Sequence, residues 1–243
     1  MQAKLRHWGY RISDKVGNTM LMPPRSAFGY YVNNGPRDSQ RVALTFDDGP
    51  CAGSTEMLLD AMSELEVCGT FFCVGENVRM NPGIAQRLVA EGHVVGSHSQ
   101  RHSRMAGLSP VDTDHIMMAE IAIEEALGVR PRLYRPPWGW LTPWEGHRLH
   151  SLGYTAIGWD VYTVDWRLPE PDARSVARQA CVDVRPGSIF CFHDGFPLAE
   201  TWTKHVTTET IKMIVPELRD RGFEFVTVSE LLGIASYAPI EVR

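Results

Sequence analysis

Residues 41–50 read RVALTFDDGP and join an apolar run to a pair of acidic residues and a Gly-Pro sequence. The run at 41–46 is apolar and β-prone, as is typical of a strand buried on both faces of a parallel sheet. Two adjacent carboxylates, Asp47 and Asp48, follow directly, and Gly49–Pro50 predicts a turn. Because neighbouring side chains point apart on an extended strand end, one carboxylate can face a set of metal ligands while the other faces a bound water. The alternative is a common turn in which an aspartate caps the backbone.

Further short apolar runs follow this strand and alternate with helical patterns. We expect six more strands, which span 69–74, 93–97, 131–135, 154–160, 187–192 and 223–228. Strands joined by helices predict an α/β fold with a mostly parallel sheet. The alternation alone leaves open whether that sheet is doubly wound and open or closes into a barrel.

The predicted helices carry apolar residues at a spacing of three or four. In the clearest of them, Pro110 marks the start and Gly128 follows the end. No linker or repeat divides the chain, so we expect one catalytic domain over 41–243. The preceding residues 1–40 are rich in Pro, Gly and Asn after position 18 and predict an irregular lead-in packed on that domain. The helices are expected at 55–66, 82–91, 110–127, 142–152, 171–181 and 205–221.

The composition excludes several classes of protein. Of the 243 residues, 44% are hydrophobic and 22% are charged, which excludes a disordered chain, a collagen and a coiled coil. A net charge of −5 without a dense Lys/Arg stripe argues against nucleic acid as a partner. No apolar run approaches the ~18 residues of a transmembrane segment. Charges interrupt the apolar stretch that a signal peptide would need in 1–17, so we expect a cytoplasmic, or membrane-proximal, protein.

The cysteines number five and show no CxxC spacing. This pattern argues against a disulfide framework and against a zinc ribbon, so we expect reduced thiols. The five residues are Cys51, Cys68, Cys73, Cys181 and Cys191.

Polar side chains gather directly after the predicted strands. In a parallel sheet the carboxyl ends of all strands point the same way, so these side chains should converge on one face, where α/β enzymes place their sites. The residues concerned are Asp47, Asp48, His98, His102, Arg135, Asp160, Asp165, Trp166, His193 and Asp194.

The sequence HSQRH at 98–102 predicts a metal site. On a helix or helical turn, His98 and His102 at i and i+4 face the same way and can bind one ion. The alternative is a solvated or hydrogen-bonded histidine pair. An aspartate from the 47–48 pair as third ligand would leave a coordination position open for water or substrate, which is the arrangement of a hydrolytic metal centre.

His193, Arg135 and Asp165 are the candidate acid–base partners. His193 could act as a general acid if a carboxylate held its ring and favoured its charged form, and Asp165 is a candidate for that partner. The alternative for His193, which ends an apolar run, is a hydrogen-bonded core histidine. Arg135 could pair with a buried aspartate and keep it ionised; otherwise it is a surface arginine before a proline-rich loop.

Taken in order, these residues resemble the five motifs of the polysaccharide deacetylase family, also called the NodB homology domain or carbohydrate esterase family 4. The resemblance covers about 41–232 and leaves 1–40 unexplained. The matching stretches are TFDDGP at 45–50, HSQRH at 98–102, RPPWG at 135–139, DW at 165–166 and HD at 193–194.

The resemblance implies a distorted (β/α) barrel of seven or eight mostly parallel strands and a divalent metal, zinc first, with cobalt, nickel or manganese as alternatives. It implies that Asp48, His98 and His102 bind the metal. It further implies that Asp47 is the general base and that His193 is the general acid. Arg135 would position Asp47, and Asp165 would tune His193. Substrate contacts are expected from Trp138, whose backbone N–H would help hold the oxyanion, and from Gly139, Trp166 and Phe192.

Four positions depart from the family pattern or are unusual. Trp138 stands where a tyrosine is frequent, Tyr162 where an aspartate is common, and Cys191 where a leucine is common. The last two bear on the choice of substrate and acyl group more than on the chemistry. Cys51, beside the TFDDGP turn, could approach the metal or be a bystander thiol.

The leading functional hypothesis is a metal-dependent N-deacetylase acting on an N-acetylated amino sugar of a glycan or glycan precursor. A second hypothesis is an O-acetyl esterase, or an amidase acting on a small amide such as a ureide. A third is a catalytically silent metal- or glycan-binding module. The oligomeric state is not indicated by the sequence. Of the seven tryptophans, Trp138 and Trp140 are the candidates for a surface that stacks on sugar rings.

Overall fold

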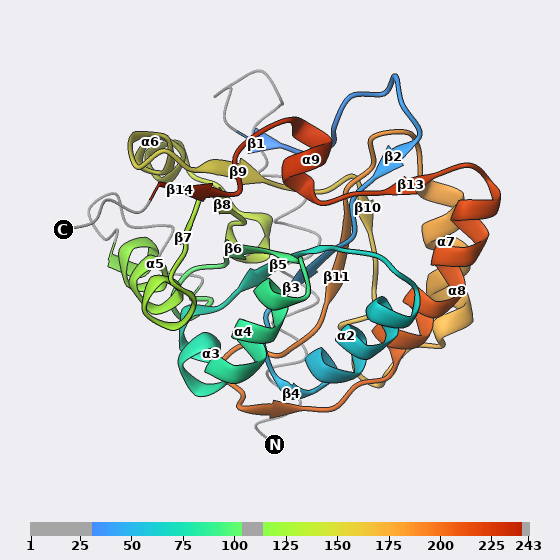
Figure 1. Ribbon diagram of the computed structural model, residues 1–243, viewed down its shortest axis with the longest axis horizontal. Helices are drawn as coiled ribbons and strands as arrows, with labels where there is room; N and C mark the ends of the chain where they lie inside the picture. Colours follow the sequence, from blue (N-terminus) through green and yellow to red (C-terminus); the bar gives the residue numbers. More distant parts are fainter. Residues whose placement is uncertain (1–30, 104–113, 240–243) are drawn as a thin grey trace.

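A curled eight-stranded sheet forms the centre of the computed structural model, which describes residues 31–103 and 114–239 (Figure 1). The strand order is β1-β9-β8-β6-β5-β3-β11-β10, and every neighbouring pair is parallel. The expected distorted barrel of seven or eight parallel strands is thereby confirmed. The strands are β1 (Tyr31–Val32), β3 (Thr45–Asp47), β5 (Thr70–Cys73), β6 (Val94–Ser97), β8 (Leu133–Tyr134), β9 (Thr155–Ile157), β10 (Val161–Tyr162) and β11 (Phe190–His193).

Three short strand pairs flank this sheet. The expected strand 41–46 is divided between β2 and β3, and the expected strand 223–228 is strand only at 224–225, because a helix begins at Val228. The pairs are β2 (Arg41–Val42) with β13 (Glu224–Phe225), β4 (Ala52–Gly53) with β12 (Thr201–Trp202), and β7 (Arg130–Pro131) with β14 (Tyr237–Ala238).

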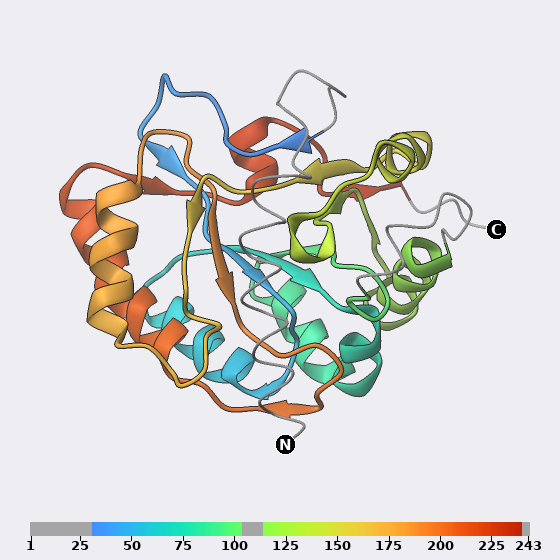
Figure 2. The ribbon, with the colours of Figure 1, turned by 180° about the vertical axis from the view of Figure 1, so that it is seen from behind.

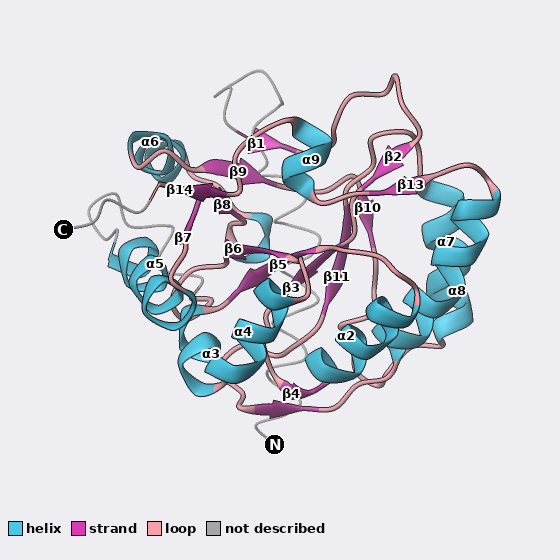
Figure 3. Cartoon of the chain, in the orientation of Figure 1, coloured by secondary structure: helices cyan, strands magenta, loops and turns pink. Residues whose placement is uncertain are grey.

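Helices surround the sheet, as Figures 2 and 3 show from opposite sides. The helices expected from the sequence are all present, within three residues at each end where the chain is described; residues 110–113 lie outside the described part. The short helices α3, η2 and α9 were not expected. The helices are α2 (Ser54–Glu64), α3 (Gly75–Met80), α4 (Pro82–Ala90), α5 (Asp114–Leu127), η2 (Pro137–Gly139), α6 (Pro143–Ser151), α7 (Ala173–Asp183), α8 (Val206–Asp220) and α9 (Val228–Leu232).

Local sequence explains where several helices begin. Thr142 caps α6 by accepting a hydrogen bond from the backbone N–H of Glu145, and Asp172 caps α7 in the same way. Thr227 and Glu230 form a reciprocal capping box at the start of α9, which explains why a helix replaces the end of the expected strand there.

The core between the sheet and the helices is built on stacked phenylalanines. Phe46, Phe71 and Phe192 are fully buried, and the ring of Phe46 lies 4.7 Å from that of Phe71 and 6.0 Å from that of Phe192. Because strand side chains alternate between faces, these rings lie opposite the polar residues of β3 and β11. The face of the sheet that carries the phenylalanines therefore packs against the helices. The opposite face carries the polar side chains of β3 and β11.

We expect Phe71→Ala to lower the free energy of unfolding by about 3–5 kcal/mol, because the substitution leaves a cavity among fully buried aromatic rings. Chemical denaturation followed by circular dichroism measures the loss. Val182→Ala is the matched control, since Val182 is 72% exposed and its truncation should change stability by no more than about 0.5 kcal/mol. A loss below about 1 kcal/mol for Phe71→Ala would contradict the packing described here.

Part of the expected lead-in belongs to the sheet. Residues 1–30 lie outside the described part of the chain, but Tyr31–Val32 form β1, which pairs in parallel with Ala156 and Ile157 of β9. Within the described ranges, none of the helices has the length and apolar character needed to span a membrane.

Candidate active site

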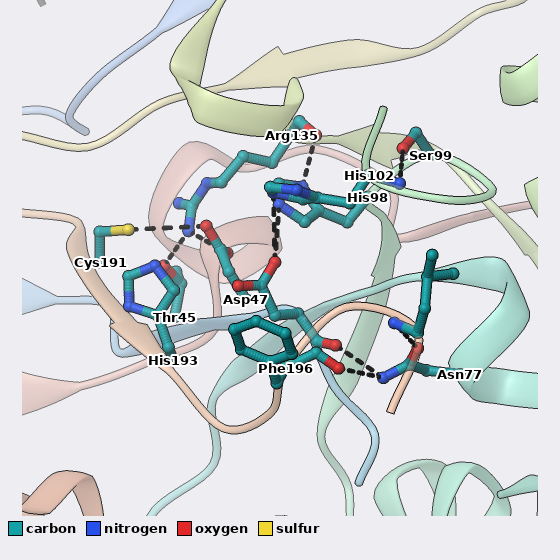
Figure 4. Close-up of polar contacts among 12 residues, drawn as sticks. Thr45, Asp47, Asn77, His98, Ser99, His102, Arg135, Cys191, His193 and Phe196 are labelled. Atoms are coloured by element: carbon teal, nitrogen blue, oxygen red, sulfur yellow. Dashed lines mark hydrogen bonds and ion pairs between the residues drawn. The ribbon is translucent and has the colours of Figure 1, made fainter. Parts of the chain in front are cut away.

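A carboxylate and two imidazoles meet at the carboxyl ends of β3 and β6 (Figure 4 shows the two imidazoles). Asp48 Oδ1 lies 3.5 Å from His98 Nε2 and 3.3 Å from His102 Nε2. These are the separations expected for ligands ~2.0–2.1 Å from one tetrahedral ion. The structure thus brings together the three residues expected to bind a metal.

The backbone that presents these ligands is irregular. Asp48 directly follows β3 and has a positive φ of 78°, which turns its side chain away from that of Asp47. His98 follows β6, but His102 lies in a loop in which Ser99 and His102 have positive φ values of 64° and 51°. The expectation that the histidines share a helical turn was wrong. The loop instead brings the rings of His98 and His102 together, with their centroids 4.9 Å apart.

The hydrogen bonds around these ligands suit a cation. His98 Nδ1 lies 2.7 Å from the backbone oxygen of Arg135, so Nδ1 carries the proton that it donates and Nε2 keeps its lone pair toward Asp48. Among the described residues, the buried Asp48 Oδ1 accepts no hydrogen bond. An acceptor-only carboxylate oxygen and an imidazole lone pair, both buried and facing each other, fit a divalent cation between them.

The protonation states fit the same cation. Burial works against the charge on Asp48, but His102 and the other nearby histidines outweigh it and hold the pKa of that carboxyl well below its usual range. Burial is also the main cause that lowers the pKa of His102 to about 4. Near neutral pH Asp48 is therefore an anionic carboxylate and His102 a neutral imidazole, and these are the forms that bind metals.

Asp47 lies next to this cluster and is held by Arg135. Arg135 is completely buried and donates from Nη1 to Asp47 Oδ1 at 2.7 Å and to Thr45 Oγ1 at 2.6 Å. Its remaining N–H groups donate to the backbone oxygens of Ile157, at 3.3 Å, and Gly158, at 2.8 Å. The surface alternative for Arg135 was wrong, and its pairing with a buried aspartate is confirmed.

His193 lies on the other side of Asp47, at the paired position of β11. Its Nδ1 is 3.0 Å from Asp165 Oδ1, and its backbone N–H donates to Asp165 Oδ2 at 2.8 Å. Burial opposes the charged ring, but the Asp165 carboxylate more than offsets it and raises the pKa of His193 to about 9. His193 is consequently held in its protonated form with Nε2 directed away from Asp165, as a general acid requires.

Three residues that hold Asp165 in place were not found from the sequence. Thr163 and Thr207 donate to its carboxylate at 2.7 and 2.8 Å, and Lys204 Nζ donates to its backbone oxygen at 2.6 Å. Single threonines and lysines without a recognisable spacing gave no signal. Only the fold shows that they converge on one carboxylate.

Asp194 is a further residue to which the sequence gave no role. It is buried, and Thr55 Oγ1 donates to its Oδ2 at 2.7 Å. Burial raises its pKa to about 7. A Cβ on Gly49 would lie only 2.0 Å from Asp194 Oδ2, so the glycine of the DDGP turn makes room for this carboxyl group. Asp194 therefore braces the turn that carries Asp48.

The aromatic residues differ from one another in their position. Trp138 has a positive φ of 64°, and its ring centroid lies 4.9 Å from that of His102. Trp166 lies 6.4 Å from His193 by ring centroids, and its Nε1 donates to Tyr162 Oη at 2.7 Å. Tyr162, at a position that departs from the family pattern, thus supports an aromatic residue at the site.

Gly139 and Phe192 are the other two residues from which substrate contacts are expected. The N–H of Gly139 is used within the turn of η2, where it donates to Pro136. Phe192 is fully buried in the aromatic core, on the face of β11 opposite His193. The expectation that Phe192 binds substrate was wrong, because strand alternation directs its ring toward Phe46 and Phe190.

The two unusual cysteines have different surroundings. Cys51 donates from Sγ to the backbone oxygen of Ala199 at 3.1 Å and is absent from the cluster of metal-ligating side chains around Asp48. Burial raises the pKa of Cys51 to about 12. Cys191, in contrast, directs its Sγ toward the carboxylate of Asp47 (Figure 4).

Comparison with protein families and curated proteins is consistent with this geometry. The family described as polysaccharide deacetylase matches residues 34–157. A chitooligosaccharide deacetylase of Bradyrhizobium sp. (strain ANU 289) is 32% identical over 201 residues, which cover 79% of this chain and 91% of the relative. The peptidoglycan-N-acetylglucosamine deacetylase PgdA of Listeria monocytogenes is 32% identical over 198 residues, which cover 81% of this chain but only 40% of that protein.

Solved structures have the same fold. The Bc1960 peptidoglycan N-acetylglucosamine deacetylase superposes with a TM-score of 0.80 at 28% identity, over 86% of this chain and 95% of the other. A family 4 acetyl xylan esterase from Clostridium thermocellum, in complex with a cobalt ion, superposes with a TM-score of 0.71 at 34% identity, over 80% and 93% of the two chains.

Proposed function

Because the chain belongs to the polysaccharide deacetylase family, we propose that it is a metal-dependent hydrolase that removes the acetyl group from an N-acetylated amino sugar of a glycan. The observation that carries the proposal is the arrangement of a carboxylate–imidazole cluster beside a buried Asp47 and a carboxylate-held His193. Amide hydrolysis needs an activated water, a stabilised oxyanion and a proton for the leaving nitrogen.

Asp48, His98 and His102 would hold the cation. When bound there, a divalent cation supplies Lewis acidity that acidifies water and polarises the acetyl carbonyl. Two imidazoles and one carboxylate suit zinc, so we propose zinc as the metal. Cobalt is the alternative, because the structure of the C. thermocellum acetyl xylan esterase contains a cobalt ion.

Asp47 and His193 would move the protons. Asp47, oriented by the Arg135 guanidinium, would accept a proton from the attacking water. His193, kept charged by Asp165, would donate a proton from Nε2 to the nitrogen of the leaving amine. The backbone N–H of Trp138 would donate to the oxyanion, and the ring of Trp166 would line the acetyl pocket.

The relatives support the choice of substrate class. Both curated relatives are deacetylases of N-acetylated glycans by name, and this chain spans 91% of the Bradyrhizobium protein. We therefore propose acetamido sugars of an oligo- or polysaccharide as substrates. An O-acetylated sugar is the second candidate, because the acetyl xylan esterase is 34% identical.

Release of acetate from a panel of substrates tests the proposal. The zinc-loaded protein is incubated with N-acetylglucosamine oligomers, with peptidoglycan fragments and with acetylated xylan, and acetate is measured enzymatically. We expect acetate from the acetamido sugars and none after chelation of the metal. Release from xylan esters alone would favour the esterase, and no release from any substrate with metal bound would contradict the proposal.

The pH dependence of turnover tests the pairing of His193 with Asp165. Because Asp165 raises the pKa of His193 to about 9, activity should fall only as the pH rises through about 9, where the acid loses its proton. Asp165→Asn removes the charge that favours the protonated ring, so this alkaline limit should move toward the ordinary value of ~6.5. Profiles of kcat/KM against pH for both proteins provide the measurement.

Asp220→Asn, at an exposed position on α8, is the control and should leave the profile unchanged. An alkaline limit that is the same with and without the Asp165 carboxylate would show that His193 is not the acid that this limit reports.

A further inference from the structure

We propose that Cys191, Asp47 and His193 form a second metal site, which binds a thiophilic divalent cation such as Cd²⁺, or zinc in excess, and thereby inhibits the enzyme. The donor atoms of these three side chains lie within 4.8 Å of one another. Thiolate, imidazole and carboxylate together are a common ligand set for zinc and for softer ions. The site shares no ligand with the cluster of Asp48, His98 and His102.

Strand register builds this site. Cys191 and His193 are two residues apart on β11, so their side chains point to the same face of the sheet. His193 pairs with Asp47 across the β11–β3 ladder, which places the carboxylate beside both. Cys191 Sγ lies 3.5 Å from Asp47 Oδ2, close to the separation of sulfur and oxygen ligands that are ~2.3 and ~2.1 Å from one ion.

The surrounding hydrogen bonds orient the ligands. Asp165 occupies Nδ1 of His193 and so leaves Nε2 for a cation, as carboxylates commonly do behind metal-binding histidines. Arg135 occupies Oδ1 of Asp47 and leaves Oδ2 facing the thiol. Cys191 and Asp47 are almost completely buried, whereas 16% of the His193 side chain is exposed, so a cation would enter past His193.

Binding is balanced by the release of protons. The cation forms bonds to Cys191 Sγ, His193 Nε2 and Asp47 Oδ2, and it displaces the thiol proton and the Nε2 proton where the ring is charged. No oxidation or reduction occurs. The thiolate and the Asp47 carboxylate together offset the charge of the added ion.

The inhibitory effect rests on the proposed function, whereas the binding does not. A cation in this site would occupy both the proposed base, Asp47, and the proposed acid, His193. Neither could then exchange a proton with water or with the leaving nitrogen, so turnover should stop although the first metal remains bound.

The experiment is a titration of the zinc-loaded protein with Cd²⁺. Binding is followed by the ultraviolet thiolate-to-cadmium charge-transfer band and by metal analysis after gel filtration, and turnover is followed by acetate release. We expect one Cd²⁺ per chain, a charge-transfer band and loss of activity. In Cys191→Ser and Cys191→Ala the band should be absent, and inhibition should require about tenfold more Cd²⁺ or still higher concentrations.

Two variants of Cys191 and one control thiol keep the test decisive. Cys191→Ala serves if the serine variant does not fold. Cys68→Ser replaces a half-buried thiol that precedes the start of β5, whereas Asp47 pairs with Phe72 near the other end of that strand, and it should keep both the band and the inhibition. A band that persists without Cys191, a band that is lost with Cys68→Ser, or equal inhibition of wild type and both Cys191 variants would overturn the proposal.

The readouts also separate the two proposals. The band and the stoichiometry do not require turnover, so a Cys191-dependent band in a protein that releases no acetate from any substrate would support the second metal site and contradict the deacetylase function. If the protein released acetate but Cd²⁺ inhibited wild type and the Cys191 variants equally, the deacetylase function would be supported and the second metal site contradicted.

Discussion

Replacement of His98 by alanine will remove metal binding and deacetylation together. His98 presents Nε2 to Asp48 at 3.5 Å, and its Nδ1 is fixed by the backbone of Arg135. Alanine therefore removes one of the three proposed ligands and leaves the Asp48 carboxylate beside the single imidazole of His102. Loss of a residue that merely supports a ligand typically weakens metal binding 10–100-fold, so loss of a ligand should exceed about 100-fold.

Metal content after dialysis and acetate release measure the two effects. His147→Ala is the matched control, because His147 lies exposed on α6 and should be dispensable for both. If the alanine variant at position 98 retained stoichiometric zinc, the metal site would have to be sought elsewhere. If it lost zinc but retained full turnover, the metal would have no part in the reaction.

Asp47→Asn should keep the metal and lose most of the turnover. The amide has nearly the shape of the carboxylate but cannot accept the proton of water, and a positioned general base contributes about 10²–10⁴-fold to the rate. Zinc content should be unchanged, because Asp48 and not Asp47 faces the imidazoles. The effect should appear in kcat more than in KM.

Asp220→Asn, which changes an exposed carboxylate at the end of α8, controls for the loss of a negative charge. Circular dichroism is needed beside the kinetics, since the asparagine can still accept a hydrogen bond from Arg135 but removes the carboxylate charge that faces this buried guanidinium. Normal turnover by the asparagine variant would refute the assignment of the base, whatever the metal content.

The sequence predicted the parallel sheet well because buried strands and amphipathic helices leave periodic patterns. It did not predict the division of 41–46 into β2 and β3, because the stretch forms one continuous β-prone run and only the different partners of the two pieces, β13 and β5, separate them. The six-residue helix α3 was missed for a related reason: its GENVRM sequence is too short to show a helical period.

For the candidate site, the sequence identified the residues that the structure brings together but not the backbone that presents them. The spacing of His98 and His102 suits a helix, yet the chain reaches the same convergence through two left-handed residues, which no spacing reveals. The divergence of Asp47 and Asp48 was expected from strand alternation, but the structure achieves it through the positive φ of Asp48, which lies beyond the end of β3. Supporting residues such as Lys204 and Thr207 become visible only when α8 and the preceding loop are folded against Asp165.

Residue 135 joins two parts of the site that are otherwise separate. Its guanidinium holds Asp47, and its backbone oxygen holds the ring of His98. Redesign of the metal preference at position 98 therefore has to leave the backbone of Arg135 in place, because a shift of this residue would also move the side chain that holds Asp47.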